Sequence, residues 1–481
     1  MTPDPSQTRT WSRRQVIGWP LLAWAVGGSP AAVALGYGGG AGDAASPPAL
    51  PARSAPSAPA GTTLRLALLV GNRVYPNPHD LPPVHKNIRD LKAVLEQRGF
   101  KVTTAVDLGP AELRRVVEQF AREALAAPPD APVLFYFTGH GMQVDAENLL
   151  LGAGVSPAAS ESVLMQSSLR FQRDVINILP RRSNGLTMTV IDACRTNLRA
   201  ALEAGDGFNQ VEAPLGCLIA FSTGAGKPAI SPAVETQNTF YTASLVKVLQ
   251  TASDDITFSD VFRLVKADVQ QTMLNHPVSA IRQMAQFPFI AENTNARLRL
   301  AVRPVTPQAE VVRFNSSDES SAWQALERAG WPLDIQRMAQ DYLQRFPAST
   351  LAGSAQVALV GAAEAEKAIR RSDVRLFKSA FFPKTDNPGI WQDIRKAARG
   401  DKDAAARVAR LYRSGSDDVA PDLNRYEGWL QFAAALGNGI AAYELALHYR
   451  ASEQPVLAAQ FESRAKELGY TPPPTLDHSR K

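Results

Sequence analysis

Apolar residues between positions 64 and 290 form short runs of strand length that alternate with stretches of helical spacing. The runs predict strands at 64–70, 100–106, 133–137, 147–151, 186–191, 218–221 and 286–290. The stretches between them predict helices at 84–98, 110–126, 163–179, 240–250 and 259–274. Strands that alternate with helices build a parallel sheet with helices on both faces. We therefore expect an α/β fold over residues 64–300, with a mainly parallel sheet sandwiched by helices.

Beyond residue 301 the pattern becomes purely helical. Residues 301–385 contain three stretches of good helical spacing, at 323–329, 334–346 and 351–369. Further on, residues 404–413 match 441–450 at an offset of 37, and residues 429–437 match 461–469 at an offset of 32. Small residues at fixed places and periods in the thirties are typical of arrays of helical hairpins. These residues resemble Sel-one-like repeats of the tetratricopeptide type, which we place at 386–470, before a polar tail at 471–481.

The N-terminus carries Arg13 and Arg14 ahead of a moderately apolar stretch, residues 18–35, that contains no acidic residue. This arrangement resembles a twin-arginine export signal that ends in small residues suited to cleavage. A single membrane anchor is the alternative, but glycine, serine and proline interrupt the span at 27–30, and few apolar residues remain to cross a core of about 30 Å. We therefore expect residues 1–36 to be an export signal, the cleaved protein to be periplasmic, and no membrane contact after cleavage.

Composition narrows the class of protein. Residues 37–63 are rich in Gly, Ala, Pro and Ser without a hydrophobic period, which is typical of a flexible linker. The 481 residues are 45% hydrophobic and 20% charged, enough for a sizeable core. The net charge of +5 comes from 51 basic and 46 acidic residues mixed along the chain, so nucleic acid is not an expected partner. The six histidines are scattered and neither cysteine has a ligand partner at metal spacing, so we expect no metal and no other cofactor.

Two of the predicted strands end in reactive side chains. The strand at 133–137 leads into Thr-Gly-His-Gly, which contains His140, and the strand at 186–191 leads into Asp-Ala-Cys-Arg, which contains Cys194. Open α/β sheets place their reactive groups beyond the carboxyl ends of strands. A thiolate is a strong nucleophile, and an imidazole can take its proton and later protonate a leaving amine. The backbone N–H groups of Gly141 and Cys194 are then candidates for an oxyanion hole.

The second cysteine, Cys217, raises the alternative of a disulfide that would block Cys194, because an exported protein meets an oxidising compartment. Cys194 follows its strand, whereas Cys217 opens the next one. In parallel neighbours these positions lie at opposite ends of the sheet, roughly five residues of about 3.3 Å apart. A disulfide requires Cα atoms within about 7 Å, so we expect none.

These motifs, together with Asn72 and the opening strand, resemble the caspase and metacaspase-like peptidase family across residues 64–290. His140 and Cys194 lie 54 residues apart, close to the roughly 50 of caspases. The resemblance implies a caspase-like fold and hydrolysis of peptide bonds in peptide or protein substrates through a His–Cys pair, without a third obligatory side chain.

The resemblance also implies a substrate-binding pocket. Asp192, two residues before the cysteine, corresponds to the acid that is thought to receive a substrate Arg or Lys in metacaspase-like members. Asn87 stands where many members have a second acid, and Ser222 belongs to the matching segment 221–229 after the nucleophile strand. The alternative for Asp192 is that its carboxylate only accepts hydrogen bonds from loop amides.

Three functions therefore compete. The first is an exported cysteine endopeptidase that cuts after Arg or Lys, with a helical array that binds a protein partner. The second is a weak or inactive caspase-like scaffold that acts through the array, and the third is a disulfide-stapled binding protein. Self-cleavage has candidate positions at Arg199 and Lys227, in loops that follow the strands around the nucleophile.

Overall fold

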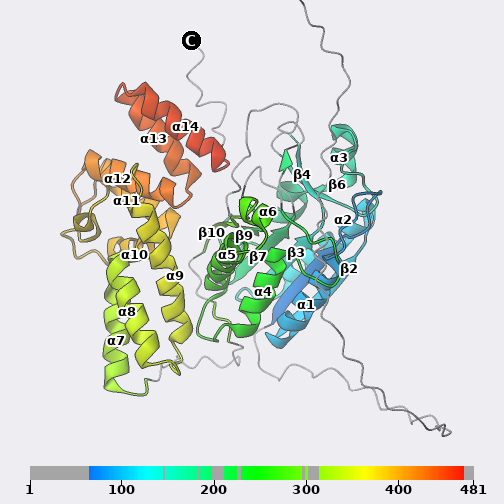
Figure 1. Cartoon of the computed structure of the whole chain (residues 1–481), viewed down its shortest axis with the longest axis horizontal. Helices are drawn as coiled ribbons and strands as arrows, with labels where there is room; N and C mark the ends of the chain where they lie inside the picture. The colour runs from blue at the N-terminus through cyan, green and yellow to red at the C-terminus, as the bar shows by residue number, and fades with distance from the viewer. Residues whose placement is uncertain are drawn as a thin grey trace, which may run out of the picture.

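The computed structural model describes residues 64–144, 147–182, 184–193, 196–197, 211, 213–224, 229–294, 298–301 and 314–470. They form a sheet region, residues 64–301, and a helical region, residues 314–470 (Figure 1). The predicted export signal (1–36), linker (37–63) and polar tail (471–481) lie outside the described residues. The same is true of Cys194, Arg199 and Lys227. None of the described helices is both long and apolar enough to cross a membrane.

A six-stranded sheet forms the centre of the sheet region, in the order β10-β9-β7-β3-β1-β2. Its strands are β1 (Arg65–Gly71), β2 (Phe100–Val106), β3 (Pro132–Thr138), β7 (Leu186–Asp192), β9 (Cys217–Phe221) and β10 (Phe289–Asn293). All neighbours pair in parallel except β10, which runs antiparallel to β9. Every residue of β1, β3 and β7 is buried, as expected for parallel strands covered on both faces. The predicted mainly parallel sheet is confirmed.

Helices cover both faces of this sheet (Figure 1). One face carries α1 (Val84–Gln97), α4 (Phe240–Thr251) and α5 (Phe258–Leu274), which is followed by the short α6 (Ser279–Gln283). The other face carries α2 (Pro110–Ala126) and a π-helical turn, η1 (Phe171–Ile176). Successive side chains of a strand point to opposite faces. Tyr136 of β3 therefore packs in the core under α1 and α4, whereas Phe135 and Phe137 pack under α2.

A smaller, four-stranded sheet begins directly after β3. Its strands, in spatial order, are β6 (Ser168–Arg170), β5 (Glu147–Leu151), β4 (Gly141–Val144) and β8 (Thr196–Asn197). The helix predicted over 163–179 is wrong, because α3 (Glu161–Ser167) ends where β6 begins. Leu169 of β6 pairs with Leu150 of β5, and both side chains are buried. This pairing outweighs the local helical spacing, since tertiary contacts override propensity.

The last strand of the central sheet also starts later than the predicted 286–290. Pro288 cannot donate a hydrogen bond to a sheet, which fits its place just before β10. Gln286 instead turns inward and donates from Nε2 to the carbonyl of Ser222 at 3.1 Å. The segment before β10 therefore contacts the end of β9 rather than extending the sheet.

The helical region is confirmed as a series of packed helices. They are α7 (Ser317–Arg328), α8 (Pro332–Arg345), α9 (Ala352–Ile369), the 3-10 turn η2 (Lys378–Phe381), α10 (Pro388–Ala397), α11 (Lys402–Ser414), α12 (Leu423–Ala435), α13 (Gly439–Ala451) and α14 (Pro455–Glu467). The sequence repeat corresponds to two consecutive hairpins, α11 on α12 and α13 on α14. Gly400, Gly437 and Gly469 follow α10, α12 and α14 with φ of 82°, 99° and 84°, the left-handed cap that glycine adopts without strain.

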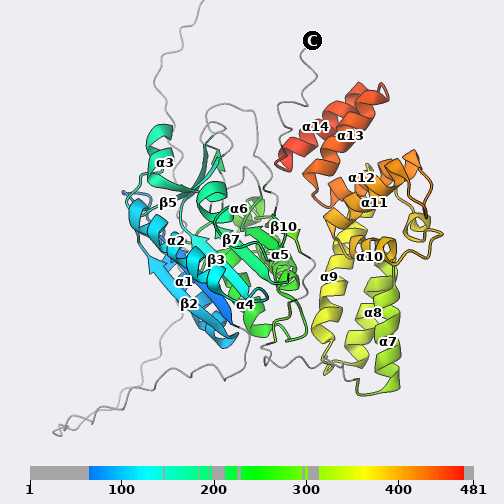
Figure 2. The same ribbon diagram turned by 180° about the vertical axis from the view of Figure 1, so that it is seen from behind.

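The helical region packs against the side of the sheet region that carries α5 and β10 (Figure 2). Lys266 of α5 pairs with Glu364 of α9 at 2.5 Å, and Lys402 at the start of α11 lies 4.2 Å over the ring of Phe289 in β10. An edge strand with open hydrogen-bonding groups invites association with other chains. The helical region therefore shields part of this edge.

Candidate active site

The candidate site lies at the carboxyl edge of the central sheet. In register, Gly71 of β1 pairs with Thr138 of β3, and Thr138 pairs with Asp192 of β7. Because parallel strands end at the same edge, the segments that follow β1, β3 and β7 are brought together there. His140 follows Thr138 by two residues and Cys194 follows Asp192 by two residues.

His140 is held with a defined ring orientation. Its Nε2 lies 2.7 Å from the backbone oxygen of His79, and since a carbonyl can only accept, Nε2 carries the proton. Nδ1 is then the basic nitrogen, and it has no hydrogen-bond partner among the described residues. Burial lowers the pKa of His140 and outweighs the bond to His79, so the imidazole is neutral and able to accept a proton at neutral pH.

Asp192 is a buried acid that accepts hydrogen bonds from hydroxyl groups. It is 4% exposed at the end of β7, and its Oδ2 accepts hydrogen bonds from Thr239 Oγ1 at 2.5 Å and from Thr242 Oγ1 at 2.7 Å. Tyr136 Oη lies 2.6 Å from Thr242 Oγ1 and must be the donor there, because Thr242 gives its own proton to Asp192. No Lys or Arg lies within ion-pair distance of Asp192 in the described part of the chain. Burial raises the pKa of Asp192 despite these hydrogen bonds.

Asn87 lies next to Asp192 through a shared threonine. Its Nδ2 donates to Thr239 Oγ1 at 3.1 Å and to Thr138 Oγ1 at 3.2 Å, while its Oδ1 accepts the backbone N–H of Thr239 at 3.1 Å. Thr239 is the N-cap of α4, so this helix end is fixed between Asn87 and Asp192. The structure therefore brings two of the three predicted substrate-binding residues together.

Ser222 lies at the same edge, just after β9. It is fully buried, and its Oγ donates to the carbonyl of Ala193 at 3.5 Å, which ties the segments after β7 and β9 together. Among the described residues, the buried Oγ1 of its neighbour Thr223 and the buried Oε1 of Gln286 have no hydrogen-bond partner. Buried polar atoms without partners are costly and recur at functional sites.

The structure describes only one of the two cysteines, Cys217. Cys194 lies outside the described residues, and so does its N–H, which is one candidate for the oxyanion hole. The other candidate, the N–H of Gly141, belongs to the buried first residue of β4. Cys217 is a free, buried thiol at the start of β9, paired in register with Thr187. Thr187 precedes Asp192 by five positions in β7. Burial raises the pKa of Cys217 to about 11, so this thiol is inert at neutral pH.

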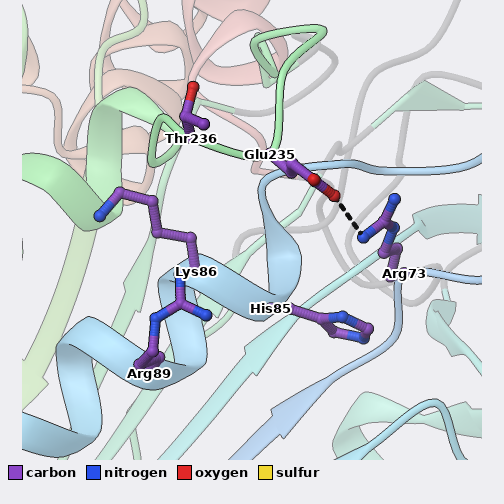
Figure 3. Close-up of a pocket in the computed structure, with 6 residues that line it drawn as sticks. All are labelled: Arg73, His85, Lys86, Arg89, Glu235 and Thr236. Carbon is purple, nitrogen blue, oxygen red and sulfur yellow. Dashed lines mark hydrogen bonds and ion pairs between the residues drawn. The ribbon is translucent and has the colours of Figure 1, made fainter. Parts of the chain in front are cut away.

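A charged pocket of about 500 Å³ opens beside this site (Figure 3). It is lined by Arg73, His85, Lys86, Arg89, Glu235 and Thr236. Arg73, which follows β1, pairs with Glu235 in the loop before α4 at 3.0 Å, as the dashed line shows. The ion pair therefore joins two segments of the site. One is the segment after β1, which contains His79, and the other is the segment before α4, which contains Thr239.

The fold and this edge define an α/β domain of the kind used by cysteine peptidases. Residues 64–298 match the family model described as "Caspase domain", so this part of the chain is similar to that family. A stretch of 132 residues is 26% identical to the human Mucosa-associated lymphoid tissue lymphoma translocation protein 1 and 25% identical to its mouse homolog. The stretch covers 27% of this chain but only 15% of each relative.

Sequence reasoning missed several residues of the site. Thr239 and Thr242 carry no motif, although an N-cap threonine ahead of the apolar pattern at 240–250 was a usable signal for the first. The contribution of His79 is a backbone carbonyl, which no residue type reveals. Tyr75 lies in a segment without hydrophobic period, and its contact with His140 follows only from the tertiary structure.

Proposed function

We propose that the chain is a cysteine endopeptidase that cuts peptide bonds after arginine or lysine, with His140 as base and Cys194 as nucleophile. The observation that carries this proposal is the orientation of His140, whose Nε2–H is bound to His79 and whose Nδ1 is left as the acceptor. Thr138 and Asp192 are paired in register on neighbouring strands. His140 follows Thr138 by two residues, and Cys194 follows Asp192 by two residues. We therefore expect Nδ1 to face the thiol of Cys194.

The reaction needs no group beyond these. The thiol gives its proton to His140 Nδ1 and the thiolate attacks the carbonyl carbon of the scissile bond. The N–H groups of Gly141 and Cys194 donate hydrogen bonds to the negatively charged oxygen. When the C–N bond breaks, the imidazolium protonates the leaving amine. Water, deprotonated by His140, then hydrolyses the thioester and regenerates the thiol.

Asp192 supports the choice of substrate. A buried carboxylate that lacks a cationic partner is costly, and a substrate guanidinium or ammonium would supply that partner. Asn87 adds a hydrogen-bond acceptor but no second charge, and Ser222 fixes the wall formed after β9. We therefore place the side chain of the residue before the scissile bond against Asp192.

Two further elements of the proposal rest on sequence patterns. Residues 1–36 resemble a twin-arginine signal, so we propose a periplasmic protein. The hairpins of the helical region resemble arrays that bind other proteins, so we propose that they recruit a partner or a protein substrate.

The test is cleavage of short reporter peptides that end in Arg, Lys or Asp, under reducing conditions, by the full chain and by Cys194→Ala. We expect turnover of the Arg and Lys reporters and a fall of about a thousandfold or more in Cys194→Ala. No Cys194-dependent turnover of any reporter would favour the scaffold function. Equal turnover of Arg and Asp reporters would remove the assigned role of Asp192.

A further inference from the structure

The segment after β1 reaches across the carboxyl edge and contacts His140 at its backbone and its ring. His79 accepts the ring N–H, as described above, and Tyr75 supplies the other contacts. We infer that Tyr75 is a positioning residue for the base, which fixes the backbone and the ring plane of His140 so that Nδ1 is presented to the nucleophile. This inference rests on the proposed role of His140 and Cys194.

The first support is the hydrogen bonding of the Tyr75 hydroxyl. It accepts the backbone N–H of His140 at 3.0 Å and donates to the carbonyl of Leu151 at 3.2 Å. The N–H of Leu151 in turn donates to the carbonyl of His140 at 3.0 Å. Tyr75 and Leu151 thus satisfy both backbone groups of His140, and the hydroxyl links them to each other.

The second support is the contact between the two rings. The centroids of Tyr75 and His140 are 4.5 Å apart and the ring planes meet at 70°, an edge-to-face arrangement. Rotation of the imidazole about its Cβ–Cγ bond would break both this contact and the hydrogen bond to His79. The ring is therefore held from its side as well as at Nε2.

The third support is that Tyr75 is itself fixed. It is 4% exposed, and its backbone N–H donates to Asp80 Oδ1 at 2.8 Å. Asn72, which begins the segment, donates from Nδ2 to the same carbonyl of Leu151 at 2.9 Å. A positioning group acts only if its own rotamer is locked by packing and hydrogen bonds, and Tyr75 meets that condition.

Gly139 shows how closely the hydroxyl approaches the loop. A Cβ at this position would lie 2.8 Å from Tyr75 Oη and 2.9 Å from an atom of the Phe137 ring. Any other residue would displace the tyrosine or the phenylalanine. The glycine before His140 is thus explained by the approach of Tyr75 as well as by loop conformation.

The test compares Tyr75→Phe with the matched control Tyr342→Phe. Tyr342 is likewise buried, and its hydroxyl also makes two hydrogen bonds, to Glu319 and Ser349, but it lies in the helical region. Misplacement of a catalytic group by about 1 Å can cost about a hundredfold in rate. We expect Tyr75→Phe to lower kcat on an Arg reporter by about tenfold to a hundredfold with KM unchanged, and Tyr342→Phe to leave both unchanged.

A second readout is independent of turnover. The nitrogen chemical shifts of His140 report which ring nitrogen carries the proton and whether the ring exchanges between orientations. We expect a single Nε2–H form in the unaltered chain, and exchange or a mixture of forms in Tyr75→Phe. If both proteins show the same single form and the same kcat, with Tyr75→Phe only less stable to heat, Tyr75 is structural and the inference is wrong.

The two readouts also separate this inference from the proposed function. An unaltered chain that cuts no reporter contradicts the peptidase, and the inference then stands or falls on the nitrogen spectra alone. An active chain whose Tyr75→Phe variant keeps its kcat contradicts the inference and leaves the peptidase intact.

Discussion

Two carboxylates, buried Asp192 in the sheet region and partly buried Asp401 in the helical region, differ in what surrounds them. Asp192 ends β7 in the sheet region and accepts hydrogen bonds from threonine hydroxyls. Asp401 caps α11 in the helical region, accepts the N–H groups of Asp403 and Ala404, and lies 3.8 Å from the guanidinium of Arg263. The first acid has no cation beside it in the described structure, whereas the second has one.

The pKa values follow this difference. Burial raises the pKa of Asp192, and the hydroxyl groups do not reverse the effect. Burial also acts upward on Asp401, but Arg263 and the N–H of Ala404 outweigh it, and the pKa of Asp401 lies below its ordinary value. A perturbed acid without a cation, at the edge that carries His140, is a functional candidate, whereas the perturbed acid at the contact between regions is structural.

The largest effect that this comparison predicts is on substrate cleavage. Asp192→Asn keeps the shape of the side chain but removes its charge, so a bound arginine side chain would be buried without a counter-ion. Loss of one partner of a buried ion pair costs about 3–5 kcal/mol, or a few hundredfold and more. We expect kcat/KM for Arg reporters to fall by at least about a hundredfold, measured beside Asp401→Asn, which should cut at the normal rate. Equal losses in the two variants would show that Asp192 has no special role.

A change at the contact between the two regions should lower the free energy of unfolding but leave the rate of cleavage unchanged. Arg263→Met removes the cation that faces Glu292 at 3.3 Å and Asp401 at 3.8 Å. The Arg263 side chain is 38% exposed, so solvent screens part of the interaction and we expect a loss of about 1–2 kcal/mol in the free energy of unfolding. Urea unfolding measures it.

The matched control for that loss is Arg345→Met, which breaks an exposed pair with Asp341 within α8. Its expected cost is below about 0.5 kcal/mol. If Arg263→Met lowers the free energy of unfolding no more than this control does, the charges between the regions do not hold them together. The structural role assigned to Asp401 would then be wrong.

The two regions also differ in how far sequence predicts them. The parallel sheet followed from buried apolar runs, and the hairpins from a repeat, because both patterns are local. The pair Asp192 and Asn87 followed from family resemblance. Thr239, which joins them, and the segment at 168–170, which forms a strand, are set by contacts across the fold, so local periodicity did not reveal them.

A smaller effect on cleavage is expected when the proposed substrate-binding pocket around Asp192 gains a second acid. Asn87→Asp introduces the second acid that the family resemblance implies at this position in many members, and two carboxylates should favour a cationic side chain more than one. We expect the preference for Arg over Asp reporters to rise about threefold to tenfold, corresponding to about 1 kcal/mol. Asn87→Ser, which shortens the side chain without adding charge, is the control. An unchanged preference in Asn87→Asp would place this side chain outside the pocket.

The smallest effect is a pair of opposite pH dependences in stability. The pKa of Asp192 is raised in the folded protein, so between the unfolded value, about 3.9, and that raised pKa the native state holds the extra proton and stability falls as pH rises. The pKa of Asp401 is lowered, so its contribution is present above about pH 3.9 and is lost as pH falls through the folded pKa. Relative to the unaltered chain, Asp192→Asn should therefore gain stability as pH rises from 3 to 7, and Asp401→Asn should lose it. Urea unfolding at a series of pH values measures the stability difference between each variant and the unaltered chain. If the two differences changed with pH in the same direction, the opposite pKa shifts assigned to Asp192 and Asp401 would be wrong.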